Sequence, residues 1–189
     1  SWKFIESLGL TLSGLDLPII KNLIVSSPDG SFITSKLDPG GFGISRYFLD
    51  NKLKEIAIEN GVILYEETKV NEVVFNDEIF TLKFNGGEIT SSLIAGSFGK
   101  RSNLDVKWQR DFVKQKADKL NNYIGVKYHV KSEFPVDTIA LHNFKDGYCG
   151  ISKVENNKYC LCYLTTAKNL KDNKNSIKEM EKNVLYKNP

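Results

Sequence analysis

The residue that most directly predicts chemistry is Arg46, which follows the glycine-rich stretch from Gly40 to Ser45. Ser45 is a typical helix N-cap, because its hydroxyl can accept a hydrogen bond from an unpaired backbone N–H one turn ahead. The positive end of a helix dipole favours anions, so a cation there is best explained by a nearby anion such as a phosphate. We therefore predict an anion site at Ser45 and Arg46. The competing interpretation is a solvated arginine on an ordinary first turn.

A second glycine-rich turn, over residues 95–99, is followed by Lys100 and Arg101. Glycine lets a backbone approach a bound group closely, and the two cations add positive charge beside it. This pattern predicts a second site, at Gly96, Gly99 and Lys100, where the backbone approaches a bound group. A solvated loop is the alternative interpretation.

The histidines and cysteines predict little chemistry of their own. His129 and His142 have no serine or carboxylate at a spacing that would indicate a catalytic base, so we interpret them as ordinary strand residues. Cys149, Cys160 and Cys162 are odd in number and lack the paired spacing of a zinc site. We predict no metal site, no disulfide framework and a reducing, cytoplasmic compartment.

The composition is that of a soluble globular protein. The chain has 189 residues, a net charge of +3 and lysines interleaved with acidic residues. This length allows one large domain or two small ones, and the charge pattern argues against a nucleic-acid partner. The longest apolar runs, such as 62–65, have four or five residues, which excludes an integral membrane segment.

Hydrophobic spacing predicts the elements that position these residues. Leu49, Leu53 and Ile56 form one face of a helix over 46–59, which we expect Gly61 to end in the left-handed conformation. Residues 62–65 are then predicted to form a fully buried strand. We expect a chain break at 38–41, before this helix, and a short apolar strand at 92–95, before the second glycine-rich turn.

Alternating patterns and turn residues predict the remaining elements. They are a helix ending at Gly9, a hairpin over 22–27 and 31–36, a meander over 68–75, 79–85 and 88–91, strands over 123–131, 138–143, 148–154 and 158–165, and a helix over 176–186. The stretch 107–121 is interpreted as a loop with a short helix. The last four strands make a plausible antiparallel sheet.

In order and spacing, these motifs resemble the middle of FAD-dependent oxidoreductases. The group they resemble is the geranylgeranyl-reductase-like flavoproteins, relatives of the aromatic-hydroxylase fold. The residues that carry the resemblance are Ile44, Ser45, Arg46, Leu49, Asp50, Leu53, Ala57, Gly61, Val62, Val70, Ala95, Gly96, Gly99, Lys100, Arg101 and Ser102.

The resemblance implies an α+β fold, as a fragment of a two-domain FAD/NAD(P)-binding fold with a mainly antiparallel sheet and few helices. Residues 1–120 would be a partial FAD-binding region with a β-meander, and 121–189 part of the substrate-binding sheet plus a helix. The resemblance also implies that the helix start and the second turn contact the flavin. It further places Tyr148, Cys149 and Tyr123 in the substrate pocket.

Three features differ from that family. The chain has no Gly-x-Gly-x-x-Gly turn after a first strand, and Phe98 stands where relatives often have aspartate. Tyr148 is followed by Cys149 and Gly150 rather than by the Trp and Phe-Pro of polyprenyl reductases. We expect a cofactor-binding half to precede Ser1 and a closing segment to follow Pro189.

We predict that the chain is a fragment of a flavin-dependent oxidoreductase that acts on a small apolar substrate. The enzyme would be a reductase or dehydrogenase, or a monooxygenase. Reduction of a carbon–carbon double bond is favoured over hydroxylation, with FAD as cofactor and NAD(P)H as the candidate electron donor. The fragment alone is expected to be inactive and to bind flavin weakly. The alternative is a non-enzymatic binding module for an apolar or lipid-like ligand. The oligomeric state is not predicted.

Overall fold

The computed structural model describes residues 2–11, 14–99, 102–114 and 122–187. The chain forms two compact units, one made of Ser1–Val62 with Asp118–Pro189 and the other of Ile63–Ala117. Both sheets are wholly or mostly antiparallel and the helices are few, so the predicted α+β fold class is confirmed.

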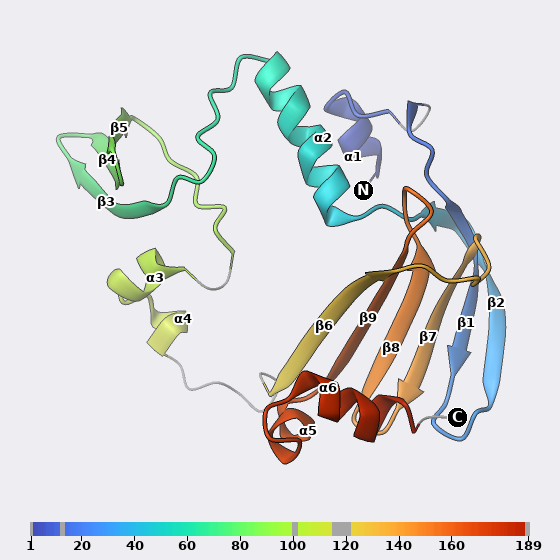
Figure 1. Cartoon of the computed structure of the whole chain (residues 1–189). Helices are drawn as coiled ribbons and strands as arrows, with labels where there is room; N and C mark the ends of the chain where they lie inside the picture. The colour runs from blue at the N-terminus through green and yellow to red at the C-terminus, as the bar shows by residue number, and fades with distance from the viewer. Residues whose placement is uncertain (1, 12–13, 100–101, 115–121, 188–189) are drawn as a thin grey trace. The chain divides into compact units, whose positions relative to one another are not determined.

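The first unit is built on a six-stranded sheet with the order β2-β1-β7-β8-β9-β6, seen edge to edge in Figure 1. Only the pair β1–β7 is parallel. The strands are β1 (Ile19–Ser26), β2 (Phe32–Phe42), β6 (Tyr123–Val130), β7 (Thr138–Phe144), β8 (Gly147–Lys153) and β9 (Tyr159–Thr166). The four predicted strands of the carboxyl-terminal half therefore form one sheet, and the predicted hairpin extends it.

The predicted break at 38–41 is wrong, because β2 continues through these residues to Phe42. Gly41 pairs with Ile20 across a register shift, and Gly40 has a φ of +80°. Proline is tolerated on an edge strand, where the missing N–H leaves no ladder bond unmade. Because β2 is at the edge of the sheet, Pro39 does not end it.

One face of this sheet is covered by the last helices of the chain, α5 (Ala167–Asp172), α6 (Ile177–Met180) and the π-helix η3 (Glu181–Leu185). Figure 1 shows them across one end of the sheet. Met180 is fully buried against Phe144 and Tyr163, which come from β7 and β9. We call this side the covered face. The predicted helix over 176–186 is confirmed as helical structure, whereas α5 was not predicted.

A glutamate also ties η3 to the covered face. The hydroxyls of Tyr128 and Tyr163 each donate a hydrogen bond of 2.8 Å to Oε1 of Glu181. Burial, and then the hydrogen bond to Glu181, raise the pKa of Tyr163 well above its ordinary value. The tyrosine therefore stays protonated and holds the helix in place.

Two further helices belong to the first unit, α1 (Trp2–Ser7) and α2 (Arg46–Glu59). Helix α2 has the predicted bounds, and Gly61 follows it with a φ of +83°. The predicted buried strand at 62–65 is wrong, because these residues form no strand and their apolar side chains are exposed. A strand is buried only when other elements cover it, and none in the described part of the chain pairs with this run.

The second unit is a three-stranded meander followed by two short helices. Its elements are β3 (Val70–Asn76), β4 (Ile79–Phe84), β5 (Gly87–Ser91), α3 (Asn103–Lys107) and α4 (Asp111–Lys114). The meander is confirmed, but the predicted strand at 92–95 is wrong: β5 ends at Ser91 and Leu93 is exposed. Among the described residues of this unit, only Ser102, Leu104 and Asp105 are buried.

The sheet of the first unit takes strands from both sides of residue 120. The division into 1–120 and 121–189 concerns functional regions of a longer protein and stays a prediction. Within the described ranges, no helix is long and apolar enough to cross a membrane.

Candidate functional site

Ser45, the first predicted cofactor residue, is held by hydrogen bonds within the chain. Its hydroxyl oxygen accepts from the backbone N–H of Phe48 at 3.1 Å, which caps α2. Its hydroxyl donates to Oε1 of Glu155 at 2.5 Å and its own backbone N–H donates to Oε2 at 2.8 Å. The residue is 2% exposed. Ser45 therefore has no polar hydrogen left for a ligand while Glu155 is bound.

Glu155 is ionised in this setting. Partial burial acts to raise its pKa, but the hydrogen bonds from the side chain and backbone of Ser45 outweigh it, and the pKa lies below the ordinary value. A carboxylate at this position also interacts favourably with the positive end of the α2 dipole. The helix start thus already holds one anion, supplied by the turn after β8.

Arg46 lies at the same helix start but points to solvent. Its guanidinium pairs with Asp50 at 3.2 Å, and its side chain is 79% exposed. Within the described residues, no acceptor contacts the backbone N–H of Arg46 or Tyr47. The exposed guanidinium and these two donors are the groups that an outside anion could reach.

The second predicted site lies in the second unit, and of its residues Lys100 falls outside the described ranges. Gly99 has a φ of +72°, and among the described residues no atom beyond its chain neighbours lies within 4 Å of where a Cβ would stand. The backbone there is open, as a close approach to a ligand requires. Gly96 differs, because a Cβ on it would lie 2.8 Å from the ring of Phe98.

Gly96 lines an apolar groove of about 760 Å³ between the meander and the two short helices. The groove has one buried carboxylate, that of Asp105, and Nε of Arg110 lies 3.3 Å from it. The same guanidinium lies 5.3 Å from the ring centroid of Trp108. Because the carboxylate is already paired, the groove presents mainly carbon atoms.

The predicted pocket residues Tyr148 and Cys149 lie on opposite faces of β8. Cys149 packs against the covered-face cluster of Phe144, Tyr163 and Met180. Burial, and then the proximity of Cys162, raise its pKa to about 11. Successive residues of a strand point to opposite sides of a sheet, so Tyr148 and Cys149 cannot line one surface. Cys149 belongs to the core of the first unit.

Tyr148 lies instead on the second side of the sheet, which we call the open face. It is 39% exposed, and its strand neighbours in register are Asn143 and Leu164. By register, Tyr123 lies on the same side as Tyr148 and Leu164, at the end of β6. Two of the three predicted pocket residues therefore share a face.

The centre of the open face carries apolar side chains, with Lys127 of β6 as the register partner of Cys162. A Cβ on Gly150 would lie 3.3 Å from Cδ2 of Leu141 and 3.6 Å from Sγ of Cys162, so both side chains stand beside the glycine. Leu141, Cys162 and Leu164 are half-buried, and Gly125 is opposite Leu164 on β6. None of these residues was among the site residues predicted from the sequence. Glycine inside a strand is the signal that could have found Gly125 and Gly150.

The other titratable groups of the described ranges form no catalytic set. Nδ1 of His142 lies 2.9 Å from Oγ of Ser26, and Cys149 is the register partner of His142. The thiol of Cys149 is protonated because burial raises its pKa to about 11, which rules out a thiolate nucleophile there. The three cysteines are free, and the described residues contain no cluster of His, Cys, Asp or Glu that could hold a metal ion.

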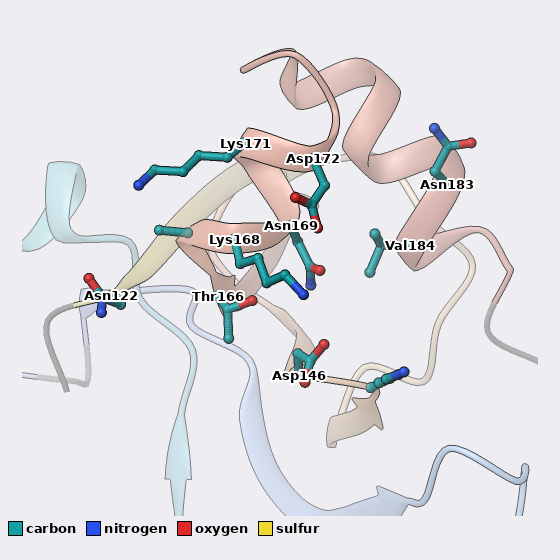
Figure 2. Close-up of a pocket in the computed structure, with 11 residues that line it drawn as sticks. Asn122, Asp146, Thr166, Lys168, Asn169, Lys171, Asp172, Asn183 and Val184 are labelled. Atoms are coloured by element: carbon teal, nitrogen blue, oxygen red, sulfur yellow. The ribbon is translucent and has the colours of Figure 1, made fainter. Parts of the chain in front are cut away.

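A polar pocket of about 830 Å³ lies between α5, η3 and the turn after β7 (Figure 2). Lys168 and Lys171 both come from α5, but Figure 2 shows their side chains pointing in different directions. Asp146 and Asp172 add carboxylates to the same wall. A binding site for an anion needs converging donors, so this mixed surface does not form one.

The fold is shared with flavin-dependent proteins of known structure. No family model matches the sequence, and no curated protein matches it. The flavin-dependent brominase Bmp2 has a TM-score of 0.68 at 18% identity, covering 94% of this chain and 47% of that one. Klebsiella pneumoniae HpxO complexed with FAD and uric acid has a TM-score of 0.61 at 13% identity, covering 78% and 40%. Halogenase PltM in complex with phloroglucinol and FAD has a TM-score of 0.62 at 14% identity, covering 80% and 36%.

This chain spans less than half the length of each of these proteins. At such identities the likeness establishes only the fold, which this chain shares with part of each of these proteins. The fold agrees with the broad prediction of an FAD-dependent oxidoreductase. The finer likeness to geranylgeranyl reductases stays a prediction.

Proposed function

We propose that this chain is part of a flavin-dependent oxidoreductase and contributes one wall of its substrate pocket. The observation that carries the proposal is the six-stranded sheet with one covered and one open face, in a fold shared with FAD-containing proteins. Ligand sites are mostly apolar concave surfaces with a few well-placed polar groups. The open face supplies the apolar surface, and the hydroxyl of Tyr148 supplies a polar group.

The substrate class that fits this face is a small planar molecule with apolar faces. Gly150 and Gly125 have no side chains that would project from this face. The side chains of Leu141, Cys162 and Leu164 provide carbon and sulfur contacts beside them. The molecules seen with two of the similar structures, phloroglucinol and uric acid, are also small and planar. Cys149 has no part in this wall, because it packs in the core.

The proposed cofactor is FAD, and the residues of this chain fit it in part. Arg46 offers an exposed guanidinium and Tyr47 an unpaired N–H for a phosphate oxygen, whereas the donors of Ser45 are taken by Glu155. Gly99 offers an open backbone, and Lys100 is proposed as a further contact. When bound, FAD would supply the redox chemistry. This chain would bind and orient the cofactor and substrate, with NAD(P)H proposed as the electron donor.

The alternative is a binding module that uses the same open face for an apolar or lipid-like ligand without a flavin. It requires no electron donor and no cofactor contact at Arg46. The two functions differ in whether the protein made from its complete natural reading frame binds FAD.

The test is the visible absorption spectrum of that protein, with the bound flavin quantified after denaturation. We expect about one FAD per protein, and an Arg46→Ala variant that binds FAD about 10- to 100-fold more weakly, since a lost charge-assisted hydrogen bond costs about 1.5–3 kcal/mol.

The matched control is Lys52→Ala, because Lys52 lies on the same helix and forms an ion pair with Glu55 at 2.8 Å. It should change FAD affinity less than about twofold, because an exposed pair contributes little. A protein that is colourless, and remains so after FAD is added, would reject the flavoenzyme and favour the binding module.

A further inference from the structure

Glu155 joins two segments that are far apart in the sequence. It lies in the turn between β8 and β9, 110 residues from Ser45, and accepts both polar hydrogens of that residue. The turn itself is well defined: the backbone N–H of Val154 donates to the carbonyl of Lys158 at 2.8 Å, and Asn156 has a φ of +57°. The carboxylate is therefore presented from a fixed turn at the end of the sheet.

A second contact joins the same two segments beside this one. A Cβ on Gly43 would lie 1.8 Å from the carbonyl oxygen of Lys153, so only glycine permits the observed approach. The backbone N–H of Gly43 donates to the carbonyl of Pro18 at 2.9 Å. Residues 43–45 are thus held against 153–155 both by steric fit and by hydrogen bonds.

We propose that Glu155 is a positioning residue whose carboxylate fixes the start of α2 on the end of the sheet. The two hydrogen bonds from Ser45 to Glu155 fix the residue at which the first turn begins. The hydrogen bond from the backbone N–H of Phe48 to Oγ of Ser45 then fixes that turn to Ser45. Arg46 follows immediately, so Glu155 also sets the direction in which that guanidinium leaves the helix. Only this last consequence rests on the proposed function.

The pairing should depend on pH. A carboxylate whose folded-state pKa lies below its ordinary value of 4.5 stabilises the fold above that value, and the stabilisation is lost as pH falls through the folded pKa. The groups near Glu155 are His129 of β6, Lys153 and Lys158 of its own turn, and Asp16, which lines the same cavity. A His129→Gln variant separates the effect of that histidine from the effect of the carboxylate.

The experiment is a pH titration of the ¹⁵N-labelled chain of 189 residues by NMR, without flavin. We expect the amide resonance of Ser45 to move with a midpoint below pH 4.5, and to lose this transition in Glu155→Gln. Hydrogen exchange at Ser45 and Phe48 should become about tenfold faster in that variant, relative to exchange at Leu53, because the first turn opens locally.

The control is Glu133→Gln, since Glu133 is exposed in the loop before β7. It should leave the Ser45 titration unchanged. A Ser45 amide that titrates identically in Glu155→Gln, or that does not titrate at all, would overturn the assignment. If Glu155→Gln lowers global stability, exchange at Ala140 measures that loss, and equal acceleration at Ala140 and Ser45 would also overturn it. None of these outcomes depends on whether the protein binds FAD.

Discussion

The two faces of the six-stranded sheet are built from alternate residues of the same strands, yet they differ in how they are used. On the covered face, Phe144, Tyr163 and Met180 are buried beneath the last helices. On the open face, Leu141 and Leu164 are only half-buried and flank positions occupied by glycine. The difference indicates that one face stabilises the fold, whereas the other is the face that we propose to bind a ligand.

The largest expected effect is on the free energy of unfolding when the covered face is truncated. Met180→Ala should lower it by about 2–5 kcal/mol, because a fully buried side chain leaves a cavity. Leu164→Ala, on the open face, should cost less than about 1.5 kcal/mol, since that side chain is partly in water already. Urea denaturation of the two variants measures both values, and equal losses would remove the distinction between the faces.

A smaller effect is expected in the reactivity of cysteines on the two faces. Cys149 has a pKa of about 11, so at pH 8 about a thousandth of it is thiolate, the form that reacts. We expect iodoacetamide to modify Cys149 at least about tenfold more slowly than Cys162 of the open face, and the rate at Cys149 to rise about tenfold per pH unit up to pH 11. Mass spectrometry of the labelled peptides measures each rate. Faster labelling at Cys149 would show that its face is not covered.

The sequence predicted best those elements that depend on local signals. Helix α2 was predicted with its correct bounds because Ser45 caps it and Gly61 follows it, and both signals lie within one turn of the helix. The run 62–65 was predicted wrongly because apolar character does not say whether another element covers a strand. The parallel pairing of β1 with β7 was not predicted either, since it joins segments more than 100 residues apart.

In the candidate site, too, the sequence did not predict contacts between segments that are far apart along the chain. Glu155 was missed because only the fold brings it to Ser45. The separation of Tyr148 from Cys149, by contrast, follows from the two-residue period of a strand and could have been predicted from the sequence. The resemblance predicted that the substrate pocket lies on this sheet, which stays a prediction. The strand register was needed to decide which residues of the sheet face outward.

The most direct test of the open face is an NMR titration of the labelled chain with indole, a small planar apolar probe. The account predicts that the methyl groups of Leu141 and Leu164 and the amide of Gly150 shift together, that Phe144 and Tyr163 do not, and that Leu141→Lys abolishes the shifts. Shifts on the covered face, or shifts only in the apolar groove of the second unit, would contradict it.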